Sequence, residues 1–338
     1  MNVKKDKTMG TLIADKFAAW EQEADERFNT LKANEEELNR IFIDIYGLQG
    51  ELTPEVEDRD VTVRRADLGR EIRSLISYAI GCMFGRYSLE VEGLIYAGGD
   101  FIEKFIQING QYYLRETAEK HPNTNPYILS PNPYFSVCAE NIIPICDDEY
   151  FEDDMLERFI DFLRKVYGAD TLEENLSFVA DAIAPFSEGG GAKRRGLTPR
   201  EVIRNYFLNS FYRDHCKIYQ KRPIYWLFDS GKKNGFKALM YLHRYSRDQL
   251  AILRTDYVHE QQERYRTQLA HIAESLTSAS GAERARLTKQ QNKLTEQLNE
   301  ISVFEEKVHH LADMQIEIDL DDGVKRNYEL FADVLARV

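Results

Sequence analysis

Apolar residues recur at three- and four-residue spacing along most of the chain, which predicts a mainly helical protein. Residues 11–46 carry one such stripe, with acidic faces opposite, and residues 65–84 carry another. We expect a long first helix, broken near Ala33 and ended by Gly47, because glycine readily adopts the left-handed conformation that follows a helix. Residues 1–85 are therefore predicted to be a helical region.

Between residues 86 and 246 the pattern changes to short apolar runs separated by glycine and proline. Residues 106–114 predict a hairpin around Asn109-Gly110, a dipeptide typical of tight hairpin turns. The apolar run at 142–145 predicts an edge strand, and the run at 225–228 predicts a buried strand. Longer amphipathic stretches predict helices at 149–167, at 172–184 and from Thr198, which begins a capping box, to about residue 215. This part is expected to be a mixed α/β domain.

The last third carries the clearest pattern of the chain. Residues 247–276 and 283–314 are two helical stretches of nearly equal length, and a short polar linker joins them. We expect an antiparallel helical hairpin whose leucine and isoleucine residues approximate a heptad seam. A short strand at 316–320 and a helix at 328–335 are predicted to follow. The whole sequence predicts a predominantly helical α+β protein with parts at 1–85, 86–246 and 247–338.

Composition places this fold among globular proteins. The chain has 338 residues, of which 43% are hydrophobic, and a net charge of −13. Its four cysteines are far apart without a CxxC pair, so the sequence indicates neither a disulfide framework nor a zinc site, and we expect reduced thiols. No apolar run is long enough for a membrane span, and the start lacks the apolar segment of a signal peptide. We therefore expect a cytoplasmic protein.

One region reverses the acidic charge of the chain. Residues 193–245 hold thirteen Lys or Arg against three Asp or Glu, and aromatic residues run through the same segment. Basic charge beside aromatic rings favours a nucleic acid as partner. The predicted phosphate contacts are Lys193, Arg194, Arg195, Lys221, Arg222, Lys232, Lys233 and Lys237.

An alternative interpretation, in which these charges stabilise the fold and bind no nucleic acid, is equally compatible with the sequence. Residues 140–188 hold fourteen Asp or Glu against three Lys or Arg, so the basic region could pair with this acidic neighbour inside one fold. Most of the aromatic residues are expected in the core, because Tyr225 to Phe228 has the pattern of a buried strand.

Catalytic motifs are incomplete or absent. Residues 132–135, Asn-Pro-Tyr-Phe, are similar to the Asn-Pro-Pro-Tyr signature of amino-group DNA methyltransferases but lack its second proline. No glycine-rich loop after a predicted strand accompanies them, so nothing here predicts binding of S-adenosylmethionine. The histidines lie on amphipathic helices without a convergent set of ligands. We expect no catalytic residue and no metal site in this chain.

Four phrases carry a resemblance to a known family. They are residues 31–48 (LKANEEELNRIFIDIYGL), 78–87 (YAIGCMFGRY), 221–228 (KRPIYWLF) and 318–324 (IDLDDGV). In collinear order they resemble the C-terminal half of PglX, the adenine-specific DNA methyltransferases of BREX phage-defence systems. The chain also resembles, more loosely, the specificity regions of single-chain restriction–modification enzymes and the coiled-coil spacers of type I specificity subunits.

The resemblance implies N6-adenine methylation with S-adenosylmethionine by a catalytic half that this chain lacks, while this half reads the DNA sequence. We therefore expect a module that recognises double-stranded DNA, with no cofactor of its own. The alternative is a protein-interaction module that docks on the catalytic half, on other BREX proteins or on a DNA-mimicking phage inhibitor. A nuclease or methyltransferase active in this chain itself is not expected.

Overall fold

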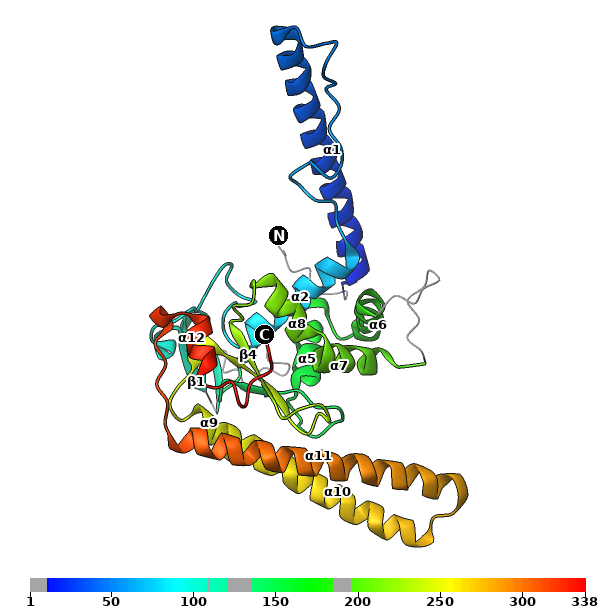
Figure 1. The fold of residues 1–338 in the computed structure, drawn as a ribbon, viewed down its shortest axis with the longest axis vertical. Coiled ribbons are helices and arrows are strands. Elements are labelled where there is room, and N and C mark those ends of the chain that lie inside the picture. The colour runs from blue at the N-terminus through cyan, green and yellow to red at the C-terminus, as the bar shows by residue number, and fades with distance from the viewer. Residues whose placement is uncertain (1–10, 109, 121–134, 185–195) are drawn as a thin grey trace.

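A central body with two long projections makes up the protein (Figure 1). The computed structural model describes residues 11–108, 110–120, 135–184 and 196–338. Helices dominate and the sheets are small and antiparallel, which confirms the predicted helical α+β class. The division into three parts at residues 85 and 246 stays a prediction. Within the described ranges, no helix is long and apolar enough to cross a membrane.

The first projection consists of α1 (Ile13–Tyr46) and the segment 47–67, which runs back along it (Figure 1). Gly47 ends the helix in the left-handed conformation, with φ of 69°, as predicted. The predicted break near Ala33 is wrong, because the helix is continuous there. The returning segment contacts α1 both before and after Ala33. Lys32 Nζ lies 2.7 Å from Asp58 Oδ1, and the Asn39 amide donates to the Pro54 carbonyl at 3.2 Å.

Short and medium helices build the body around a three-stranded sheet. These helices are α2 (Leu68–Met83), α3 (Phe101–Lys104), α4 (Arg115–Lys120), α5 (Met155–Tyr167), α6 (Leu172–Ile183), α7 (Pro199–Asn209) and α8 (Phe211–Ile218). The predicted capping box is confirmed, because Thr198 and Glu201 bond each other's backbone at the start of α7. The helix predicted to reach residue 215 is divided at Ser210 into α7 and α8.

The sheet separates two hydrophobic cores. Its strands β3 (Ile142–Pro144), β5 (Lys237–Tyr241) and β4 (Tyr225–Asp229) lie in that order, and all pairs are antiparallel. Because side chains alternate along a strand, Tyr225 and Leu227 face the core of α2 and α5–α8, whereas Trp226 and Phe228 face the opposite core. The predicted edge strand and buried strand are both confirmed. A separate hairpin, β1 (Phe105–Ile108) and β2 (Gln111–Leu114), also confirms its prediction, although Asn109 in its turn lies outside the described residues.

The second projection is the predicted helical hairpin. After η1 (Leu242–Arg244), the chain forms α9 (Gln249–Ile252), the π-helical segment η2 (Leu253–Val258) and α10 (His259–Ser278), and α11 (Gly281–Asp313) returns beside α10 (Figure 1). The expected seam residues Ile272, Leu287, Leu294, Ile301 and Val308 are all buried.

The C-terminal elements differ from the prediction. Residues 316–319 form no strand, and η3 (Leu320–Asp322) and α12 (Val324–Glu329) follow them. The helix predicted at 328–335 is wrong over most of its length. Instead, the amide of Asp229 donates to the Val334 carbonyl at 3.0 Å and the amide of Ala336 donates to the Leu227 carbonyl at 2.8 Å. The C-terminal segment thereby satisfies the outer edge of β4.

Candidate nucleic-acid interface

The structure separates the eight predicted phosphate contacts. Lys193, Arg194 and Arg195 lie outside the described residues. Lys221 and Arg222 are exposed in the turn between α8 and β4, and Lys232 and Lys233 are exposed in the loop between β4 and β5. These two pairs stand at opposite ends of β4, a distance of about 16 Å for a five-residue strand.

Lys237 does not fit a phosphate contact. Its side chain is buried, and Nζ donates to the Leu208 carbonyl at 3.0 Å. The same Nζ lies 3.8 Å from Asp229 Oδ2. An ammonium group satisfied inside the fold cannot also reach DNA, so this prediction has to be corrected.

Part of the basic region pairs with the acidic segment before it, as the alternative interpretation predicted. Arg200 binds Glu173 at 2.6 Å, and Arg204 forms a buried ion pair with Asp154. Arg244 is held by the Cys138 carbonyl at 2.9 Å, and its guanidinium lies 3.9 Å from the centre of the Phe101 ring. These arginines stabilise the body and are not available as a continuous cationic surface.

Four cations remain exposed on α8 and the turn that follows it. This α8 cluster consists of Arg213, Lys217, Lys221 and Arg222, and none of them forms an ion pair with a described residue. Arg213 and Lys217 were not among the predicted phosphate contacts. Their i,i+4 spacing on a helix that leads to Lys221 was the signal that could have identified them.

An unusual backbone conformation fixes the turn. Gln220 and Lys221 have φ values of 50° and 62°, although neither is glycine. The amide of Lys221 donates to the Cys216 carbonyl at 2.8 Å, which closes the end of α8. A left-handed conformation costs an ordinary residue about 1–2 kcal/mol, and such conformations concentrate at functional sites. The amide of Arg222 also donates to the Tyr219 carbonyl at 2.9 Å, so both cations of the turn are tied to α8 through their backbone.

The loop with Lys232 and Lys233 is fastened to the helical hairpin. The Glu300 carboxylate of α11 accepts from Ser230 Oγ, Lys233 N and Gly235 N at 2.8–3.0 Å. The Gln297 amide donates to the carbonyl groups of Lys233 and Asn234, each at 3.1 Å. Lys233 Nζ is also paired with Glu296 at 2.7 Å. Lys232 is therefore the cation that this loop leaves unpaired among the described residues.

Gly235→Ala should detach this loop from α11. A β-carbon at this position would lie 2.7 Å from the Gln297 carbonyl oxygen and 3.2 Å from Ile301 N, and both are backbone atoms. We expect the free energy of unfolding, measured by urea denaturation, to fall by about 1–3 kcal/mol, as for other overpacked sites. Gly50→Ala is the matched control, because a β-carbon there meets nothing within 4 Å. Equal stability of the two variants would contradict the described packing.

The aromatic residues of the basic region do not form a stacking surface. Tyr206, Phe207, Phe211, Tyr212, Tyr225, Trp226, Phe228, Phe236 and Tyr241 are buried, which confirms that most belong to the core. Stacking on bases requires an exposed ring face. The arrangement favours contacts to a phosphate backbone over contacts to unstacked bases.

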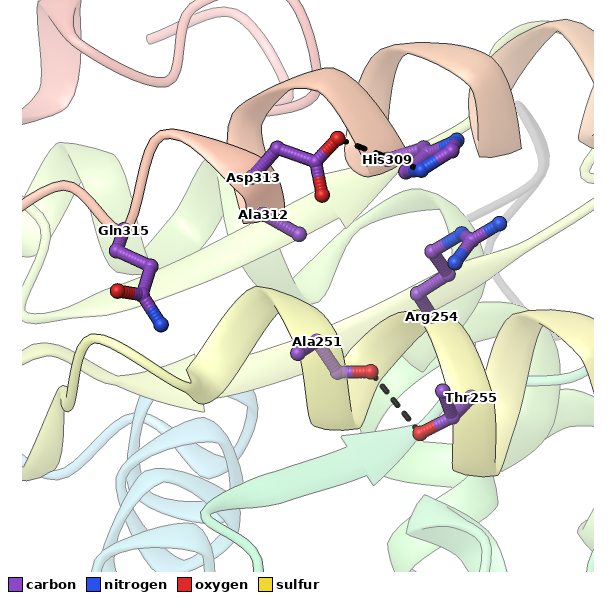
Figure 2. Close-up of a pocket in the computed structure, with 7 residues that line it drawn as sticks. All are labelled: Ala251, Arg254, Thr255, His309, Ala312, Asp313 and Gln315. Atoms are coloured by element: carbon purple, nitrogen blue, oxygen red, sulfur yellow. Dashed lines mark hydrogen bonds and ion pairs between the residues drawn. The ribbon is translucent and has the colours of Figure 1, made fainter.

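A cavity of about 280 Å³ lies between η2 and α11, and several of its polar lining groups are paired. Figure 2 shows the Asp313 carboxylate turned toward His309, 3.4 Å away, and the Thr255 hydroxyl bonded to the Ala251 carbonyl at 3.0 Å. Arg254 is bound by Glu305 at 2.5 Å. This arrangement pairs no nucleophile with a general base, so it supports no catalytic role for the cavity.

The glycines after β4 do not fit a cofactor. Gly231 and Gly235 lead into β5 and not into a helix, and the amide groups of this loop bind Glu300. Loops that bind nucleotide cofactors connect a strand to a helix N-terminus. The loop between β4 and β5 therefore lacks the strand-to-helix geometry of a loop that binds a nucleotide cofactor.

Comparison with known proteins places the chain beside adenine-specific methyltransferases. It is 45% identical over 322 residues to Adenine-specific methyltransferase PglX of Lacticaseibacillus casei strain Zhang, and the alignment covers 92% of this chain and 23% of the relative. It is 35% identical over 346 aligned positions to Adenine-specific methyltransferase BrxX of Escherichia coli O9:H4 strain HS, and this alignment covers 96% of this chain and 26% of the relative. No family model matches. The resemblance to PglX is thereby confirmed, and the chain corresponds to part of such a protein, spanning about a quarter of the length of each relative.

Proposed function

We propose that this chain is the DNA-contacting part of an adenine-specific methyltransferase of the PglX type. The observation that carries the proposal is the α8 cluster, four exposed cations within ten residues in a protein of net charge −13. The similarity to PglX and BrxX along nearly the whole chain supports DNA as the polymer that these four cations contact.

Phosphate binding is the role that suits the α8 cluster. Arg213 and Lys217 are one helical turn apart on α8, and the exposed Lys221 and Arg222 follow in the turn that ends the helix. Each cation neutralises a phosphate and releases counterions, which holds the protein on a duplex without reading its sequence. Lys232, at the other end of β4, can meet the same duplex, because one helical turn of DNA spans about 34 Å.

Methyl transfer would take place elsewhere in a protein of this type. The catalytic part and S-adenosylmethionine are assigned to polypeptide that this chain does not contain. The chain's own contribution is to bind double-stranded DNA and to hold it in a defined orientation, since the α8 turn and the β4–β5 loop are both fastened to the body.

The double variant Lys221→Ala/Arg222→Ala tests the proposal. We expect its affinity for a fluorescently labelled DNA duplex, measured by anisotropy at low salt, to fall about tenfold or more, because two phosphate contacts are lost. Both side chains are exposed, so the unfolding transition should not change.

Arg284→Ala/Arg286→Ala is the matched control. It removes two exposed cations from the far end of the second projection and leaves the α8 cluster intact. Equal losses in both double variants would indicate unspecific charge attraction, and unchanged binding by Lys221→Ala/Arg222→Ala would refute the proposed surface.

A further inference from the structure

An apolar stripe lies exposed near the tip of the first projection. Leu38, Ile41, Phe42 and Ile45 occupy positions i, i+3, i+4 and i+7 of α1, and Tyr46 extends the stripe. Phe42, Ile45 and Tyr46 are 54%, 69% and 70% exposed. This spacing is the one by which an amphipathic helix inserts its apolar face into a groove of a partner protein.

Among the described residues, no segment covers this stripe. Segment 47–67 covers a different face of α1, where Ile43 and Phe28 are buried and Asn39 bonds Pro54. Gly47 and Leu48 close the end of the helix through their own amides. The returning segment thus stiffens α1 and leaves the apolar stripe facing outward.

The acidic charge around the stripe limits which partner surfaces it can bind. Residues 33–60 hold nine Asp or Glu against two Lys or Arg, and Glu37, Asp44 and Glu51 are exposed around the stripe. Carboxylates repel both DNA phosphates and a second, equally acidic tip. A groove with an apolar floor and a rim of lysine and arginine is complementary to this surface.

We propose that the stripe docks into such a groove on the part of a PglX-type methyltransferase that this chain does not match. The matched relatives carry a chain like this one as about a quarter of a single polypeptide, so the remaining three quarters accompany it there. The groove would receive Phe42 and Ile45 as anchors, and its basic rim would pair with the carboxylates beside them. This inference is independent of DNA contact by the α8 cluster.

The test measures binding of the full chain to L. casei PglX from which the matching segment has been removed, with the folding of this probe verified by circular dichroism. We expect binding that weakens with salt and falls about tenfold or more in Phe42→Glu and in Ile45→Glu, because buried apolar anchors dominate such interfaces. Val303→Glu is the matched control, since Val303 is a 57% exposed apolar residue on the other projection.

Asp44→Asn and Glu51→Gln should weaken binding and flatten its salt dependence, because they remove exposed carboxylates that form no ion pair with a described residue. Sedimentation of the full chain over a range of concentrations examines the competing occupant, a second copy. No binding to the folded probe, equal binding by Phe42→Glu and Val303→Glu, or self-association that Phe42→Glu abolishes would each overturn the proposal.

Discussion

Replacing Asp154 with alanine will lower the free energy of unfolding by about 3–5 kcal/mol, the range found when one partner of a buried ion pair is removed. Asp154 is 1% exposed and pairs with Arg204, whose side chain is 11% exposed. Its Oδ1 also accepts from the amides of Leu156 and Glu157, each at 3.0 Å, and so caps α5. The substitution therefore leaves a buried arginine without its counterion and two helix amides without an acceptor.

The neighbouring residue supplies the control. Asp153 pairs with Arg158 at 3.0 Å, but its side chain is 51% exposed, so Asp153→Ala should change stability by less than about 1 kcal/mol. Asp154→Asn keeps an oxygen for the cap and loses the charge, and its stability should fall between the two. Urea denaturation of the three variants gives the order, and similar values for Asp153→Ala and Asp154→Ala would rule out a buried ion pair at this site.

Acid will destabilise the protein through His215. This residue of α8 is buried, and its Nε2 accepts from the amides of Ile224 and Tyr225 at 3.2 Å. Burial, helped by the charge of Arg86, lowers the pKa of His215 to about 3. The unfolded state binds a proton near pH 6.5, so stability that is complete above this pH is lost as the pH falls toward 3. The loss attributable to His215 should be about 2–3 kcal/mol between pH 7 and pH 4.5.

His215→Gln isolates this contribution, because an amide oxygen can still accept from the backbone and does not titrate. The difference in unfolding free energy between wild type and variant, followed from pH 7 to pH 4.5, should shrink by the amount just given. A constant difference over this range would show that His215 is not a neutral buried acceptor.

Local signals predicted helix ends and strand positions well. The Thr198 capping box and the Gly47 helix end depend on neighbouring residues alone, and both form as expected. The buried strand at residues 225–229 followed from its apolar run, and the hairpin seam followed from leucine and isoleucine spacing. In these cases the local pattern and the tertiary environment favour the same structure.

Features that depend on distant contacts were not predictable. α1 continues through Ala33 because segment 47–67 supports it from outside. Residues 316–319 have the alternation of a strand, but the open edge of β4 is taken by residues 334–336. The sequence pattern identifies a strand but does not show which distant segment pairs with its open edge.

Charge counting located the basic region and raised the possibility of pairing with the acidic segment, but it did not show which cations are paired. Arg204 and Lys237 contribute to the count of thirteen cations and are both bound inside the body. Arg213 and Lys217 belong to the exposed α8 cluster, and their i,i+4 spacing places them on one helix face. Arg200 and Arg204 have the same spacing and are paired, so the spacing alone does not separate the two sets. The candidate site was therefore predictable as a region and not as a set of residues.

The salt dependence of DNA binding tests the central claim most directly. Affinity of the full chain for duplex DNA should be measured between about 50 and 200 mM salt, with wild type beside Lys221→Ala/Arg222→Ala. Four to five phosphate contacts predict a slope of about −4 in log affinity against log salt, and the double variant should reduce its magnitude by about 2. Binding that does not respond to salt, or an identical slope in the double variant, would contradict a phosphate-binding surface on the α8 cluster.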